Sequence, residues 1–155
     1  MRDLFGHDER IGRNVHFKSE KFDWATPLKI YDKLNAEFHF TLDPCATEDN
    51  AKCDKYFTIK EDGLKQSWKG EVVFMNPPYG RDIKKWIEKA WNESRGGATV
   101  VCLVPSRTDT RWWHRYCMKG EIRFIEGRLH FDNHKWNAPF PSAIVIFKME
   151  GKSDV

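Results

Sequence analysis

The sequence lacks any apolar run of the roughly 18 residues that a bilayer-spanning helix needs. Its first 14 residues mix charges of both signs and do not contain the apolar stretch of a secretory signal. We therefore expect no membrane partner, and we expect the protein to remain in the cytoplasm.

The sequence also lacks the spacing of a metal site or a disulfide framework. Its 4 cysteines include no Cys-x-x-Cys pair, and its scattered histidines show no ligand spacing. We expect free thiols and no bound metal. Cysteines occur at positions 45, 53, 102 and 117, and the histidines considered are His114, His130 and His134.

Aromatic residues, in contrast, are abundant: they make up 14% of the 155 residues and include 7 Trp and 11 Phe. A hydrophobic fraction of 40% with 32% charged residues is typical of a globular protein, and this length accommodates one domain. We expect a charged arm over residues 1–21, a globular domain over 22–149 and a tail over 150–155. The net charge of +3 permits a polyanionic partner without requiring one.

Hydrophobic periodicity predicts alternating strands and helices, followed by strands alone. The first expected helix has Thr26 as its N-cap and Pro27 at its first helical position, and it runs to about Glu37. A second helix is expected from Asp82 to Gly96, and a third after an N-cap at Thr108 or Asp109. One helical turn is expected at 48–52. Strands are expected at 40–42, 56–59, 71–75, 98–104, 122–125, 129–131 and 143–147.

This order predicts an α/β fold: a mainly parallel sheet with antiparallel C-terminal strands. The interval from Asp43 to Asn76 is too short for two complete βα units. One strand–helix pair is therefore expected to be reduced or missing. Trp112 and Trp113 are expected in the core.

Polar or proline-containing turns follow three of the expected strands. They begin at Asp43, Asn76 and Pro105. Ligands of open parallel sheets bind beyond the carboxyl ends of the strands, so we place the functional site at this edge.

The segment Asn76-Pro77-Pro78-Tyr79 is the most informative of these turns. Two prolines stiffen the backbone and carry no N–H, so their carbonyls are acceptors without local partners. Asn76 adds a side-chain oxygen and Tyr79 an aromatic face. Two acceptors beside an aromatic ring suit a planar group with an NH2. The alternative is a tight strand-to-helix turn in which the prolines have no further role.

Further motifs occur in a fixed order across residues 22–147. They are Asp23-Trp24-Ala25-Thr26-Pro27, Thr41-Leu42-Asp43-Pro44-Cys45-Ala46, Asp62-Gly63-Leu64 with Trp68, Asn76 to Gly80, Leu103-Val104-Pro105-Ser106-Arg107-Thr108-Asp109, and Gly127-Arg128-Leu129 with Phe131. This series resembles the small phage and prophage DNA N6-adenine methyltransferases (Dam family), enzymes that use S-adenosylmethionine and carry an Asn-Pro-Pro-Tyr motif. A phage-encoded member would act in the cytoplasm of the bacterial host.

The resemblance implies a reduced Rossmann-like methyltransferase fold and assigns roles to residues. Catalysis falls to Asn76, Pro77, Pro78 and Tyr79: Asn76 and the Pro77 carbonyl accept hydrogen bonds from the adenine N6 amino group, and Tyr79 stacks on the flipped base. The implied residues for S-adenosylmethionine are Trp24, Thr26, Pro27, Asp43, Cys45, Ala46 and Asp62. Physical chemistry is compatible with this, because a helix start suits the donor's carboxylate and Asp43 suits its ammonium group. Asp43 alternatively acts only as the cap of its turn.

Basic and hydroxyl side chains in the C-terminal third suit phosphate contacts, and DNA is the partner that the resemblance implies. The candidates are Arg107, Thr108, Arg111 and Arg128. A solvated helix face with ion pairs would explain the same pattern.

Two alternative functions remain open. The same acceptor turn suits an RNA adenine or a protein glutamine amide. The turn after Asp43 contains no glycine, unlike most donor-binding loops, and a non-enzymatic nucleic-acid-binding module with a decayed pocket would also fit this departure.

Overall fold

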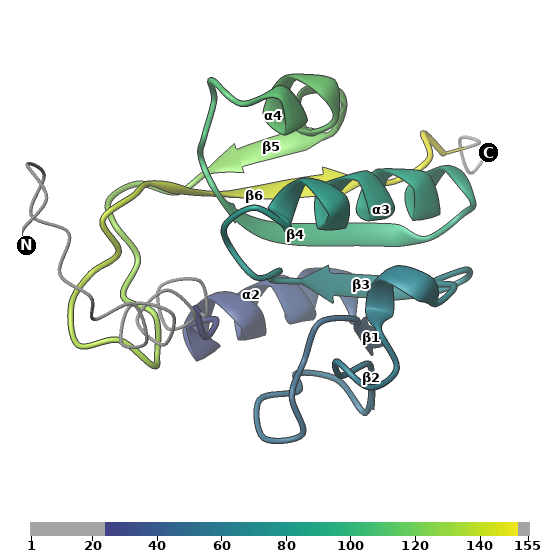
Figure 1. Cartoon of the computed structure of the whole chain (residues 1–155), viewed down its shortest axis with the longest axis horizontal. Coiled ribbons are helices and arrows are strands. Elements are labelled where there is room, and N and C mark those ends of the chain that lie inside the picture. Colours follow the sequence, from purple (N-terminus) through teal and green to yellow (C-terminus); the bar gives the residue numbers. More distant parts are fainter. Residues whose placement is uncertain (1–23, 152–155) are drawn as a thin grey trace, which may run out of the picture.

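One mixed sheet organises the computed structural model, which describes residues 24–151 (Figure 1). Its strand order is β2-β1-β3-β4-β6-β5. The first four of these strands run parallel, and β6 is antiparallel to both β4 and β5. The strands are β1 Leu42–Asp43, β2 Lys55–Tyr56, β3 Val72–Met75, β4 Thr99–Pro105, β5 Glu121–Phe124 and β6 Ser142–Phe147. The expected α/β class and sheet organisation are confirmed.

Two helices cover the sheet. In Figure 1, α3 (Ile83–Arg95) lies in front of the sheet and α2 (Leu28–Phe38) behind it. The Tyr31 ring of α2 packs edge-on against Phe74 of β3, with centroids 5.2 Å apart, and Trp91 of α3 packs likewise against Phe147 of β6 at 5.8 Å. Strands β4 and β6 are almost wholly buried, so their continuous apolar runs form the centre of the core.

Short elements fill the remaining connections. They are the 3-10 helices η1 (Gly63–Lys65) and η2 (Cys117–Lys119) and the five-residue helix α4 (Arg111–Arg115). Between β1 and β3 the chain forms only β2, of two residues, and η1, which is the reduced strand–helix pair expected from the sequence. Trp112 and Trp113 of α4 are buried, as predicted.

The structure corrects several local expectations. Pro27, not Thr26, is the N-cap of α2, and Thr110, not Thr108 or Asp109, caps α4 by accepting from the Trp113 amide. The expected first strand shifts from 40–42 to Leu42–Asp43, and the second shortens to Lys55–Tyr56. The single helical turn expected at 48–52 is a turn over residues 48–50, in which the Ala51 amide donates to the Thr47 carbonyl at 3.1 Å. Residues 129–131 belong to a loop rather than a strand.

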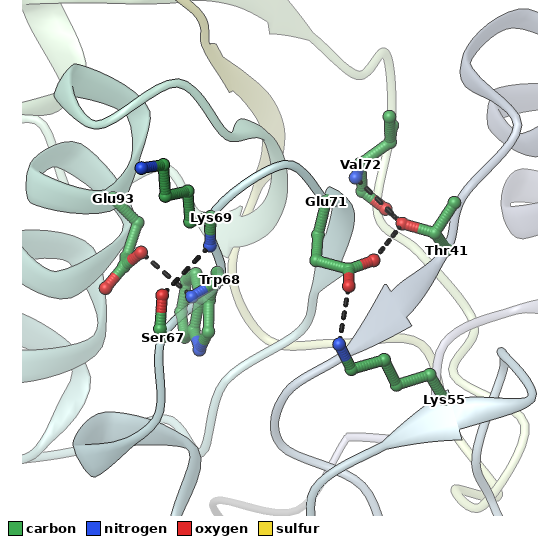
Figure 2. A network of polar contacts seen from close by, with 8 residues as sticks. All are labelled: Thr41, Lys55, Ser67, Trp68, Lys69, Glu71, Val72 and Glu93. Atoms are coloured by element: carbon green, nitrogen blue, oxygen red, sulfur yellow. Dashed lines mark hydrogen bonds and ion pairs between the residues drawn. The ribbon is translucent and has the colours of Figure 1, made fainter.

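A side-chain network holds the amino-terminal ends of the short strands together (Figure 2). Glu71 accepts hydrogen bonds from the Thr41 hydroxyl at 2.6 Å and from Lys55 Nζ at 2.5 Å. Thr41 Oγ1 in turn accepts from the Val72 amide at 2.9 Å. Strands of two residues make few ladder bonds, so these contacts fix the relative positions of β1, β2 and β3.

Gly63 is required where the chain passes close to the end of β1. A Cβ at this position would lie 2.0 Å from the Pro44 carbonyl oxygen and 3.2 Å from the Trp86 ring. The Gly63 carbonyl accepts a hydrogen bond from Trp68 Nε1 at 3.0 Å, and Trp68 is fully buried. The Asp-Gly-Leu motif and Trp68 therefore form one packing unit beneath the turn that follows β1.

Replacing Gly63 by alanine is expected to destabilise the protein by about 1–3 kcal/mol, because the methyl group must displace backbone. Chemical denaturation of the wild type and of Gly63→Ala measures this difference. Gly151→Ala is the matched control, since a Cβ there meets no atom within 4 Å. Equal stability of the two variants would contradict this account of Gly63.

Candidate active site at the carboxyl ends of β1 and β3

The strand order reverses direction at the junction of β1 and β3. From β1 the chain adds β2 on one side and then returns to place β3 on the other. Adjacent parallel strands whose connections diverge leave a crevice at their carboxyl ends, where ligands of α/β proteins bind. Asp43 ends β1 and Asn76 directly follows β3, so the topology brings these two predicted residues to the same crevice.

The side-chain amide of Asn76 is held in one orientation. Its Nδ2 donates to the Trp24 carbonyl at 2.5 Å and to Thr26 Oγ1 at 2.9 Å, which uses both N–H groups. Its Oδ1 is buried and accepts no hydrogen bond from the described residues. A buried acceptor without a partner is costly and is a feature of ligand sites.

The backbone after Asn76 also offers an acceptor. Pro77 is buried, Pro78 is exposed, and the described residues donate no hydrogen bond to the Pro77 carbonyl. Prolines at both positions remove N–H groups that could pair locally. Pro77 and Pro78 therefore contribute carbonyl oxygens and no N–H donors to this turn.

A small open pocket of about 50 Å³ lies beside this turn. Four of the residues expected to bind the donor line it together with Asn76: Trp24, Thr26, Asp43 and Cys45. The remaining lining residues were not predicted from the sequence; they are Ala25, Asn50, Lys52 and Phe74. Asn50 and Lys52 belong to the segment in which one helical turn was expected. The sequence feature that pointed to their place in the pocket was that this segment follows the Asp43 turn.

Asp43 is a buried carboxylate at the floor of the pocket. It is 6% exposed, and its oxygens accept from the Cys45 amide at 3.4 Å and the Lys52 amide at 3.1 Å. Burial raises the pKa of Asp43 to about 6, although both amides favour the charged form. A cationic group entering the pocket would stabilise the ionised carboxylate.

Cys45 supports the turn after β3 rather than offering a nucleophile. Its thiol donates to the Asn76 carbonyl at 3.3 Å. Burial, with the nearby Asp43 carboxylate, raises the pKa of Cys45 well above its usual value. The thiol therefore stays protonated and links the turn after β1 to the turn after β3.

Tyr79 lies under a cluster of aromatic side chains. Its ring is 3% exposed, and its hydroxyl donates to the Leu103 carbonyl at 3.2 Å. Phe140 packs edge-on against this ring at 5.6 Å, and Trp24 lies roughly parallel to it at 6.5 Å. A base that stacks on Tyr79 must therefore take the place of part of this cover.

Three residues expected at the donor site do not line the pocket. Pro27 begins α2, with its carbonyl accepting from the Ile30 and Tyr31 amides at 3.1 Å. Ala46 is buried and its amide donates to the Phe57 carbonyl. Asp62 caps η1 by accepting from the Leu64 amide at 3.1 Å. Their assignment to the donor stays a prediction, and each has a structural role.

The residues expected to contact phosphate are all exposed. Arg107, Thr108 and Arg111 follow β4, and Arg128 lies beyond β5. None of these arginines forms an ion pair within residues 24–151. Arg123, in contrast, is paired with Glu37 through two hydrogen bonds of 2.7 Å.

Residues 24–151 contain neither a membrane-spanning helix nor a cluster of metal ligands. None of their helices is long and apolar enough to span a bilayer. Within the same range, no group of three or more His, Cys, Asp or Glu side chains could hold a metal ion.

Comparison with known proteins identifies the family of the chain. The family model for DNA N-6-adenine-methyltransferase (Dam) matches residues 14–150. A DNA N-6-adenine-methyltransferase of Escherichia phage T1 is 31% identical over 113 residues, which are 70% of this chain and 47% of that protein. "Putative methyltransferase YfdM" of Escherichia coli K12 is 36% identical over 63 residues, 36% of this chain and 69% of that protein.

The chain belongs to the Dam family of DNA N6-adenine methyltransferases. It spans about half the length of the phage T1 relative. The resemblance stated from the motifs is thus confirmed.

The raised pKa of Asp43 predicts a pH-dependent stability. The folded carboxyl has a pKa of about 6 against 3.8 for the unfolded chain, so the folded state binds more protons between these values. Its contribution to the free energy of unfolding is complete below pH 4 and falls by ~3 kcal/mol as the pH rises through 6. Denaturation of wild type and Asp43→Asn from pH 4 to 7 should show the wild type losing stability relative to the variant. A difference independent of pH would contradict this assignment.

Proposed function

We propose that this chain transfers the methyl group of S-adenosylmethionine to the N6 amino group of adenine in DNA. One observation carries the proposal. The fixed Asn76 amide leaves a buried, unpartnered oxygen beside a pocket whose floor is a buried carboxylate. Membership of the Dam family supports the choice of reaction.

The acceptor side of the site would act through Asn76 and Pro77. Their oxygens would accept the two N–H bonds of an adenine N6 amino group. This arrangement directs the nitrogen lone pair away from the turn and stabilises the positive charge that develops on nitrogen during transfer. Because no strong base is needed before attack, the uncharged sequence neighbours of Tyr79, Pro78 and Gly80, are compatible with the reaction.

The donor side would use the pocket. S-adenosylmethionine, when bound, supplies an electrophilic methyl group on a positive sulfonium. Asp43 fits its ammonium group, and the Thr26 hydroxyl, Trp24 and Cys45 complete the wall. At about 50 Å³ the pocket is smaller than the roughly 300 Å³ of sites that enclose whole ligands, so it would hold one end of the donor. Pro27, Ala46 and Asp62 do not line this pocket, so they would contact the part of the donor that lies outside it.

DNA would be held by the exposed basic groups. Arg107, Thr108, Arg111 and Arg128 offer guanidinium and hydroxyl donors to phosphates, and such contacts add affinity without sequence information. The target adenine must leave the duplex to reach a site this deep. Unstacking costs a few kcal/mol, which backbone contacts and stacking in the site would offset.

Asn76→Ala tests the acceptor role. Loss of the side-chain oxygen should lower the rate of methyl transfer by about 100-fold or more. Losses of this size are typical when one preorganised polar group that stabilises charge in the transition state is removed. Donor binding should change by less than about tenfold, because the hydrogen bonds of Ala25 to Asp132 and Asn133 still hold the segment that carries Trp24 and Thr26. The measurements are transfer of labelled methyl to unmethylated DNA with nucleoside analysis, and calorimetry with S-adenosylmethionine.

Asn92→Ala, an exposed asparagine on α3, is the matched control and should behave as wild type. Equal losses of transfer and donor binding in Asn76→Ala would indicate collapse of the turn instead. Label found in RNA or protein but not in DNA would overturn the choice of substrate.

The proposed phosphate contacts predict a change in salt dependence. Arg111→Ala should weaken DNA binding uniformly across sequences and lower the slope of log affinity against log salt by about 0.9. Arg123→Ala is the matched control, because the Arg123 guanidinium is occupied by Glu37 and should leave the slope unchanged. Fluorescence anisotropy at several salt concentrations measures both slopes. An unchanged slope for Arg111→Ala would remove Arg111 from the interface.

A further inference from the structure

The loop from residue 125 to residue 141, between β5 and β6, is attached to the candidate site. Its Asp132 amide donates to the Ala25 carbonyl at 3.1 Å, and its Asn133 Oδ1 accepts from the Ala25 amide at 2.8 Å. Asp132 Oδ2 also accepts from the Leu28 amide at the start of α2, at 3.3 Å. In Figure 1 this loop lies beside the beginning of α2, beyond the end of β3.

The underside of the loop is part of the aromatic cover. Phe131 is fully buried and its ring lies 5.1 Å from that of Trp24. Phe140 lies 5.0 Å from Trp24 and 5.6 Å from Tyr79. The Ala138 amide donates to the Leu129 carbonyl at 2.7 Å and closes the loop around Phe131. The loop is thus held in one position next to the acceptor turn.

Trp136, on the same loop, turns a large aromatic ring to solvent. It is 74% exposed, whereas the other six tryptophans of the chain are buried or half-buried. Lys135 Nζ lies 5.3 Å from the centre of the Trp136 ring. An isolated exposed apolar residue needs no explanation, but a tryptophan beside a cation on a loop fixed over a nucleic-acid site has the composition of a base-stacking contact.

The charges of the loop are compatible with a polyanion at this end. Lys135 and Arg128 are exposed, and neither forms an ion pair within residues 24–151. The carboxylate of Asp132 is directed to the α2 start, where it complements the helix dipole. Glu126, the other acidic residue of the loop, is nearer in sequence to Arg128 than to Trp136.

We propose that Trp136 stacks on a DNA base adjacent to the target adenine while Lys135 contacts a neighbouring phosphate. This inference rests on the proposed function and names the element that holds the DNA beside the acceptor turn. Stacking tolerates any base, so Trp136 contributes affinity and helps keep the duplex open rather than selecting a sequence. The hydrogen bonds of Asp132 and Asn133 connect this contact to the segment that orients Asn76.

The test compares Trp136→Ala with Trp136→Phe. Anisotropy with a fluorescein-labelled duplex should show about tenfold weaker binding for Trp136→Ala and near-wild-type binding for Trp136→Phe, which retains an aromatic face. The salt slope should not change in either variant, because stacking releases no counterions. Lys135→Ala should instead lower the slope. Methyl transfer to the same duplex and S-adenosylmethionine binding are measured in parallel.

Met149→Ala is the matched control, since Met149 is an exposed apolar residue following β6, at the other end of that strand from the loop. Wild-type binding by Trp136→Ala, or equal weakening in Trp136→Phe, would overturn the stacking contact. If the wild type transfers methyl groups to the duplex while Trp136→Ala binds normally, only this inference fails. A wild type that binds the donor but neither binds nor methylates DNA overturns the proposed function as well.

Discussion

The candidate site depends on the two hydrogen bonds that the Asn76 amide donates, to the Trp24 carbonyl and the Thr26 hydroxyl. An asparagine side chain alone can present either its oxygen or its NH2 to a ligand. Because both N–H groups are engaged by the segment before α2, the oxygen is left on the remaining side, buried and without a partner among the described residues. The chemistry expected of Asn76 thus depends on residues fifty positions earlier in the chain.

Sheet topology supplies the second condition. Asp43 and Asn76 follow strands paired in parallel, with Leu42 opposite Val73, so both turns reach the same crevice. The Cys45 thiol joins the turns by donating to the Asn76 carbonyl. Gly63 allows η1 to lie directly beneath Pro44, where any side chain would collide with backbone.

The sequence was sufficient for features set by local pattern. The buried strands β3 and β4 and the helix from Ile83 were predictable because apolar periodicity reports burial directly, although β4 continues through Pro105, where the strand was expected to stop. Contacts between distant segments left no such signal. Thr26 has the form of an N-cap, yet its hydroxyl is used by Asn76, and residues 129–131 alternate like a strand because Phe131 packs on Trp24. The docking of Asn133 on Ala25, 108 residues apart, has no sequence signature at all.

The aromatic cover constrains how a base could reach the site. Tyr79 is 3% exposed, with Trp24 on one side of its ring and Phe131 and Phe140 at its edges. Moving the backbone of residues 24–26 would break the hydrogen bonds that orient the Asn76 amide. It would also break the hydrogen bonds that join Ala25 to Asp132 and Asn133. Rotation of the Trp24 side chain would break none of these backbone bonds, although it would give up the ring stacking on His134 at 3.9 Å. Of these two changes, rotation of the Trp24 side chain is the one that leaves the hydrogen bonds orienting the Asn76 amide in place.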